Sequence, residues 1–281
     1  MAYIDQFDEV LAHVKIKEKV YVLDGTDKMT PSSLIPADII FTEGLVIEKM
    51  ETNEWGWQML WDNTQVEKNI VVLMGSISES GEMSGDVFIT SQDYARLKRS
   101  TSLKLGKEKF IEKYFTDKNP GAIVDSVEIQ NESNDSLPLV QKAKFTIPLN
   151  SSGDYKYFSA NLFSGLEKNP FVADARVSDV FFGTNQYYQV VANITIPEGY
   201  EFEALPKSVR MILPDTTMSF TRRIVTQNNL LSVRTVLEVN KPFFSADEYP
   251  DFKEFQKKLF DMMNEQFVIR KKPKSLVNPN K

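Results

Sequence analysis

The segment Gln186–Ile196 reads Gln-Tyr-Tyr-Gln-Val-Val-Ala-Asn-Ile-Thr-Ile, and it decides the fold class of this 281-residue chain. From Tyr188 onward every second side chain is apolar, which is the period of a β-strand that buries one face. Strand-like runs with turn residues between them follow at 209–213, 218–225 and 230–239. The C-terminal part of the chain is therefore predicted to be an antiparallel meander with one buried face.

Helical patterns interrupt the strands in three places. The segment 245–266 places Phe252 and Phe255 on one apolar stripe and acidic residues in its first turn, so it is predicted to be a helix that caps the meander. The segments 92–98 and 106–116 are also predicted to be helical. Further strands are predicted at 69–77, 85–90, 123–130 and 141–147, with 267–269 as a final edge strand.

These elements predict a mainly β fold: two antiparallel β-sandwich-like domains with a few packed helices, preceded by a short β-hairpin. The hairpin occupies residues 1–36, and the first β-rich domain with its helical insert occupies 37–165. The C-terminal β-sandwich-like domain with its capping helix occupies 166–272, and a basic tail occupies 273–281.

The composition argues against several classes of protein. An apolar fraction of 42% is that of a folded chain rather than a disordered one. The net charge of −6, with no basic cluster before the extreme C-terminus, argues against a nucleic-acid partner. No apolar run approaches the roughly 18 residues of a membrane span. The sequence has no phosphate-binding glycine loop and no metal-ligand spacing, so we predict no cofactor and no metal.

The first predicted strand pair spans residues 8–23. Val10, Val14 and Ile16 alternate on one apolar face, and Lys17-Glu-Lys19 is predicted to make the turn. A lone hairpin is marginal in water, and an open strand edge can pair with another chain. We therefore expect this hairpin to pack on the following block or to pair with the sheet of a neighbour.

Several segments, in order over nearly the whole chain, resemble one bacterial family. They are Tyr21-Val-Leu-Asp24-Gly-Thr26-Asp27 with Leu34-Ile-Pro36, Asn169-Pro170-Phe171 with Phe182-Gly183, Ile196-Pro197-Glu-Gly199-Tyr200 with Leu205-Pro206-Lys207, and Tyr249 ahead of Phe267-Val-Ile-Arg-Lys-Lys272. The family has an N-terminal β-sandwich, a transglutaminase-like core and a C-terminal β-rich region of unknown function. The chain resembles the end of that core followed by the C-terminal region.

The resemblance implies that Asp24 matches the aspartate of a Cys-His-Asp triad. Glu9 stands where relatives carry the histidine, His13 is the only histidine of the chain, and there is no cysteine. Because a triad needs a thiolate and a base, we expect Asp24, Glu9 and His13 to be vestigial rather than active. The alternatives are a turn carboxylate for Asp24, and a displaced base, a metal ligand or a surface strand residue for His13.

Trp55, Trp57 and Trp61 are the candidate binding residues, because flat aromatic side chains can stack on sugars or anchor a protein partner. Trp55 and Trp57 would share one strand face. The alternative is that the three side chains pack in a core between domains, which is the commoner use of tryptophan.

The leading hypothesis is a non-catalytic structural or interaction module of a transglutaminase-like envelope protein, periplasmic if the parent carries a signal peptide. Its partner would be a protein or a glycan. The first alternative is the C-terminal portion of a transglutaminase-like cysteine peptidase or acyltransferase, with Asp24 in the triad. The second alternative is a carbohydrate-binding β-sandwich that uses the three tryptophans.

Overall fold

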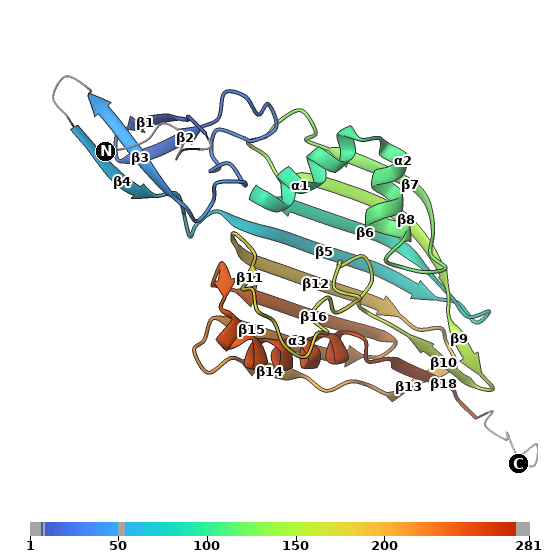
Figure 1. The fold of residues 1–281 in the computed structure, drawn as a ribbon. Coiled ribbons are helices and arrows are strands. Elements are labelled where there is room, and N and C mark those ends of the chain that lie inside the picture. Colours follow the sequence, from blue (N-terminus) through green and yellow to red (C-terminus); the bar gives the residue numbers. More distant parts are fainter. Residues whose placement is uncertain (1–6, 8, 50–53, 274–281) are drawn as a thin grey trace, which may run out of the picture.

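The structure is a computed structural model, and it describes residues 7, 9–49 and 54–273. The predicted mainly β class, with a few helices and an N-terminal hairpin, is confirmed (Figure 1). Most of the predicted basic tail, residues 274–281, lies outside the described residues, as does Asp8. Within the described ranges, none of the helices has the length and apolar character needed to cross a membrane.

The centre of the fold is an eight-stranded mixed sheet. In spatial order its strands are β14 (Val209–Ile212), β15 (Met218–Gln227), β16 (Leu230–Val239), β12 (Asn185–Thr195), β5 (Val66–Ile77), β6 (Glu82–Gln92), β8 (Leu139–Pro148) and β7 (Ile123–Gln130). All neighbours are antiparallel except β12 and β5, which pair in parallel along their whole length. The sheet therefore continues across the boundary predicted near residue 165.

The parallel pair between β5 and β12 is the feature that the predicted antiparallel domains did not include. Leu73 and Ala192 are neighbours in this pair, and both are fully buried. Parallel strands cannot be joined by a tight hairpin, and here helices and six other strands separate the two in sequence. The division of the chain into two folding units remains a prediction.

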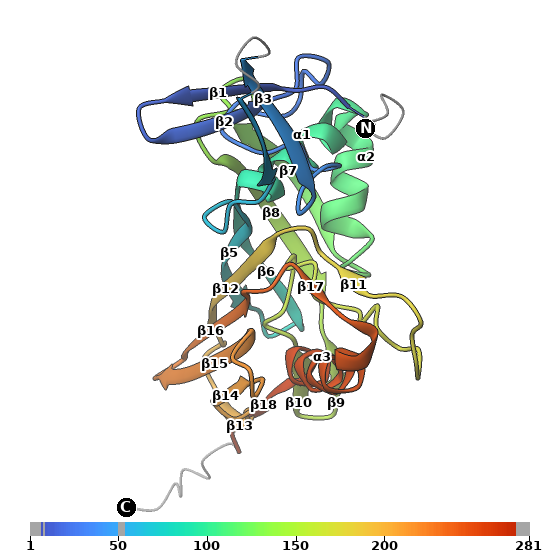
Figure 2. The ribbon, with the colours of Figure 1, turned by 60° about the vertical axis from the view of Figure 1, so that its left-hand side comes forward.

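One face of the sheet is covered by helices, as Figures 1 and 2 show. Helix α1 (Asp93–Lys104) packs on β5 and β6, and it leads into α2 (Lys107–Ile111) and a π-helical turn (Glu112–Thr116). Helix α3 (Tyr249–Met263), which follows a 3₁₀ turn at Ala246–Glu248, packs on the β14–β16 half. Short strands β11 (Val180–Phe181) and β17 (Phe243–Phe244) pair beside it.

A second, four-stranded sheet covers the far end of the same face. Its order is β13 (Tyr200–Ala204), β18 (Phe267–Lys271), β10 (Tyr155–Phe158) and β9 (Asn150–Ser152). The prediction of an edge strand at 267–269 was wrong in position, because β18 lies between β13 and β10. Phe267 and Ile269 of β18 are buried in a hydrophobic core that they share with strands of the large sheet.

Two hydrophobic cores lie between the sheet and these covering elements. The first joins residues of both predicted domains, for example Val71 and Leu73 of β5 with Ile194 of β12 and Ile269 of β18. The second surrounds Phe252 of helix α3. The first core therefore binds both halves of the chain together, in agreement with the continuous sheet.

Two strand pairs extend beyond the large sheet at the N-terminal end (Figure 1). They are the predicted hairpin, β1 (Ala12–Ile16) with β2 (Lys19–Leu23), and a ribbon, β3 (Glu43–Lys49) with β4 (Glu54–Met59). Lys17 makes the turn of the hairpin at a positive φ of 56°. We call the second pair the β3–β4 ribbon.

The hairpin packs through the face opposite to the expected one. Val22 of β2 is buried with Ile35 and Leu60 in a small cluster. By contrast, Val14 and Ile16, which the sequence pattern marked as the face to be covered, are 36% and 56% exposed. The expectation of a packed hairpin is met, but its alternating apolar face stays uncovered within the described chain.

Candidate interaction site

Asp24 and His13 make separate contacts in the structure. Asp24 Oδ1 accepts hydrogen bonds from the backbone N–H of Thr26 at 2.7 Å and from its hydroxyl at 2.6 Å. These bonds lower the pKa of Asp24, the hydroxyl bond contributing most. His13 Nε2 lies 3.0 Å from Gln58 Oε1 of β4. The chain has no cysteine, so it supplies no thiolate nucleophile, and Asp24 has the geometry of a turn carboxylate.

Trp55 and Trp57 lie together on one face of the β3–β4 ribbon, as the spacing predicted. Trp55 pairs with Ile47 across the ribbon, and Trp57 pairs with Leu45. Their exposed fractions are 64% and 54%, and Ile47 is 56% exposed. Isolated exposed apolar residues are common, but a contiguous set on one ribbon face is a candidate interaction surface.

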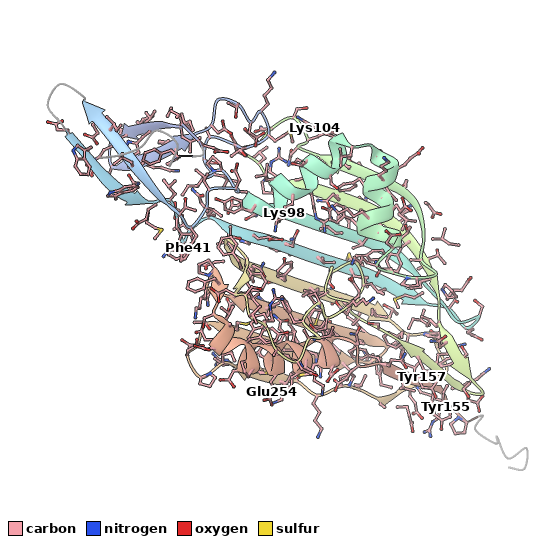
Figure 3. All side chains as sticks on the ribbon, in the orientation of Figure 1. Phe41, Lys98, Lys104, Tyr155, Tyr157 and Glu254 are labelled. Carbon is pink, nitrogen blue, oxygen red and sulfur yellow. The ribbon has the colours of Figure 1, made fainter. Side chains whose placement is uncertain are left out.

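Trp61 does not belong to this surface. Its ring meets Phe41 edge-on at 5.7 Å and packs in a cluster with Tyr94 and Leu97 of helix α1. Phe41, labelled in Figure 3, lies where the ribbon meets the sheet, and its ring also contacts Phe243 at 5.4 Å. The geometry of Trp61 is that of the alternative interpretation, a packing residue between parts of the fold.

A groove of about 400 Å³ adjoins the exposed tryptophans. It is lined by Trp55, Trp57, His13 and the carboxylates Glu48 and Glu54, among others. Because side chains alternate along β4, Trp55 and Trp57 line the groove from one face of the ribbon, and Glu54 lines it from the other. That combination can receive an apolar side chain with a cation beside it, or the face of a sugar ring with its hydroxyls.

A second groove, of about 460 Å³, lies between the hairpin and the loop before the sheet. Tyr21, Ser33, Trp61 and Gln65 are among its lining residues. Gln65 holds this region in place, since its Oε1 accepts hydrogen bonds from the backbone N–H of Ile35 and from Tyr94 Oη. Both grooves and the exposed ribbon face therefore lie at the N-terminal end of the described chain.

A buried polar network was missed by the sequence analysis. Glu67 of β5 accepts bonds from Lys98 Nζ at 2.5 Å and from Tyr188 Oη at 2.9 Å, and Arg99 of α1 donates to Gln141 Oε1 at 2.5 Å. Burial lowers the pKa of Arg99 to about 10 and raises that of Tyr188. Lys98 is labelled on α1 in Figure 3. The network fixes α1 on the sheet.

The signal for this network was present in the alternation of β5. Every second residue of β5 is buried, and this alternation includes Glu67 and Asn69 ahead of Val71 and Leu73. Polar side chains therefore occupy core positions at the start of the strand. Such residues need partners. The partners of Glu67 come from α1 and β12, and that of Asn69 is the hydroxyl of Ser91 on β6. Among the described residues, no three acidic, histidine or cysteine side chains gather closely enough to hold a metal ion.

Residues 154–269 match a family described as a Domain of Unknown Function with solved structure, DUF3858. The chain is also similar to a protein from Parabacteroides distasonis described as a "putative protease", with 19% identity and a TM-score of 0.34. That match covers 41% of this chain and 23% of the other. No curated protein matches the chain.

Proposed function

We propose that this chain is a non-catalytic interaction module that binds a protein partner through the β3–β4 ribbon. The observation that carries the proposal is the pair of exposed tryptophans, Trp55 and Trp57, on one face of a two-stranded ribbon. The proposed setting is the envelope of a bacterium, where the chain would be part of a transglutaminase-like protein. The sequence resemblance to the end of such a core supports this setting.

The energetics favour a covered state of the ribbon. A tryptophan offers roughly 250 Å² of surface. At exposed fractions of 64% and 54%, the two rings leave roughly 300 Å² to be buried, worth about 7 kcal/mol at ~25 cal/mol per Å² before the cost of association. Tryptophan is also among the commonest anchors of protein interfaces. A partner that covers this face would stabilise a strand pair that is marginal by itself.

Photo-cross-linking tests the proposal. The cross-linking amino acid p-benzoylphenylalanine replaces Trp57 in one chain and Phe181, which is 58% exposed on another part of the molecule, in a matched chain. In cells that produce the chain, position 57 should give an adduct with one protein, which mass spectrometry identifies. Equal adducts at position 181, or none at 57, would contradict the proposal.

The identified protein is then purified and titrated with the chain. The W55S/W57S variant should bind it at least about 30-fold more weakly, which corresponds to roughly 2 kcal/mol for an interface anchor. The control variant F181S should bind like the unmodified chain. Circular dichroism of each variant verifies that the fold is retained.

A glycan is the second candidate partner, favoured by the groove that combines Trp55 and Trp57 with Glu48 and Glu54. Aromatic rings stack on sugar rings, and carboxylates accept bonds from their hydroxyls. A glycan array probed with the chain and with the variant Trp57→Ala tests it, since specific binding should be lost in the variant. If the chain binds no glycan on the array, this candidate is refuted.

The third candidate is the rear portion of a transglutaminase-like cysteine peptidase or acyltransferase. Because the chain has no cysteine, a nucleophile would have to come from elsewhere, with Asp24 orienting the base. The purified chain should not hydrolyse peptides. Hydrolysis that is abolished in Asp24→Asn would overturn the non-catalytic proposal.

A further inference from the structure

The large sheet has a second face, opposite to the helices. Figures 1 and 2 show α1, α2 and α3 on one side of the sheet only. The alternate residues of β5 that point away from the core, such as Ile70 and Val72, are half-buried, and Met74 is 54% exposed. Within the described chain, no core cluster forms on this side. We call it the open face.

The centre of the open face is apolar. Val72 of β5 lies between Phe88 of β6 and Val191 of β12, and Val236 of β16 extends the patch by one strand. A solvated face of an antiparallel sheet usually carries polar residues at such positions. Here Phe88, Val72 and Val191 instead form an apolar row over β6, β5 and β12, across the seam between the two halves of the chain. Val236 of β16 adjoins this row diagonally, because Arg234 stands directly opposite Val191.

Cations surround this patch on both sides. Each of them lies on the open face, because its strand register pairs it with residues that point away from the core. They are Lys68, Lys142, Lys144, Arg210, Arg223 and Arg234. In the described chain, none of these six side chains forms an ion pair. On the opposite side of the molecule, Lys253, Lys257 and Lys258 of α3 are all paired with carboxylates.

Two of the cations are held in place by aromatic rings. Lys142 Nζ lies 5.4 Å from the centre of the Phe88 ring, and Lys68 Nζ lies 5.5 Å from that of Tyr187. These contacts keep the ammonium groups over the apolar patch while leaving their hydrogen-bond donors free for other acceptors. The open face is thus a cationic, half-apolar surface on a chain whose net charge is −6.

We propose that the open face is a docking surface for an acidic protein. The partner would place apolar side chains over Val72 and Val191 and carboxylates against the surrounding cations, so that both features of the face are used together. This surface lies on other strands than the β3–β4 ribbon, so the inference does not depend on the function proposed for the ribbon.

The pattern of charge favours a protein over a nucleic acid or a lipid bilayer. Asp86, Glu128 and Glu238 lie in register among the cations of the open face. A continuous row of phosphates would be repelled at each of these carboxylates. A protein surface of mixed charge with an apolar centre can match both signs and the apolar patch.

The test uses the full chain and a soluble copolymer of glutamate and tyrosine as the acidic, partly aromatic probe. At low salt, calorimetry should detect binding, and the charge-reversal variant K142E/R234E should weaken it about fivefold or more. The matched control K257E/K258E carries the same change in net charge on α3 and should bind like the unmodified chain. Equal weakening in both variants would show non-specific attraction and overturn the proposal.

A second variant separates the apolar patch from the charges. V191T/V236T keeps the shape and the charge of the face but adds two hydroxyl groups, and it should also weaken binding of the copolymer. Tighter binding of oligothymidylate or of phosphatidylglycerol vesicles than of the copolymer would assign the face to another class of partner and refute this one. Absence of binding to all three probes would also refute it. Circular dichroism establishes that each variant is folded.

Discussion

Phe252 of helix α3 gives a sharp test of whether the two halves of the sheet fold as one unit. Its side chain is fully buried, and its ring lies 4.7 Å from those of both Phe171 and Phe244. Replacing a buried phenylalanine with alanine typically costs 3–5 kcal/mol, and here two close ring pairs are lost as well. We therefore expect Phe252→Ala to lower the free energy of unfolding by about 4 kcal/mol.

The assay follows unfolding in urea with two signals from different parts of the chain. Circular dichroism reports all helices. In a W55F/W57F background, fluorescence reports only Trp61, which packs beside α1 in the other half of the sheet. With a denaturant slope of about 3 kcal/mol per M, the midpoint should fall by about 1 M. Because β5 and β12 share one core, both signals should shift together.

Divergent midpoints would refute this reasoning. If the Trp61 transition stays in place while the dichroism splits into two steps, the halves unfold independently, and the predicted division near residue 165 describes real folding units. The control Phe181→Ala removes a ring that is 58% exposed. It should change the free energy of unfolding from either signal by less than about 0.5 kcal/mol.

Three further outcomes follow from local geometry. Gly85→Ala should cost about 3 kcal/mol in thermal unfolding, because a Cβ there would lie 1.9 Å from a backbone carbonyl of β5, whereas Gly56→Ala, with open space around it, should be near neutral. Ser245→Ala removes the side-chain half of a capping box with Glu248 and should destabilise by about 1 kcal/mol, measured by the dichroism midpoint. Burial raises the pKa of Glu167, so the charged carboxylate disfavours the folded state at a pH above that value. Glu167→Gln removes this charge and should raise the urea midpoint at pH 7. The gain in stability should vanish as the pH falls below the pKa of the carboxyl in the unfolded chain. An unchanged midpoint at pH 7 would mean that Glu167 is solvated in solution.

Local elements were predictable because their signal is local. The strand predicted at 123–130 is β7 with the same bounds, since side-chain alternation and turn residues suffice to define it. Its partner β8 also follows closely along the chain. By contrast, the place of β18 between β13 and β10 depends on segments far apart in sequence, and the local pattern at 267–269 contains no information about them.

The candidate site shows the same limit. The spacing of Trp55 and Trp57 was enough to place them on one ribbon face, because strands alternate strictly. Nothing in the sequence near Trp61 indicated that its ring would turn toward Phe41 and α1. The open face was equally hidden, because its apolar patch exists only once β5 and β12 pair in parallel.

The two proposed surfaces differ in charge, and this difference makes them separable by experiment. Glu48 and Glu54 line the groove next to the exposed tryptophans of the ribbon, whereas the open face carries six lysines and arginines that form no ion pair in the described chain. Surfaces of opposite sign select different partners, so loss of one should leave binding at the other intact. With a purified partner of the ribbon, W55S/W57S should therefore weaken binding, and K142E/R234E should leave it unchanged. Weakening of the same partner by each variant alone would instead mean that one partner spans both surfaces.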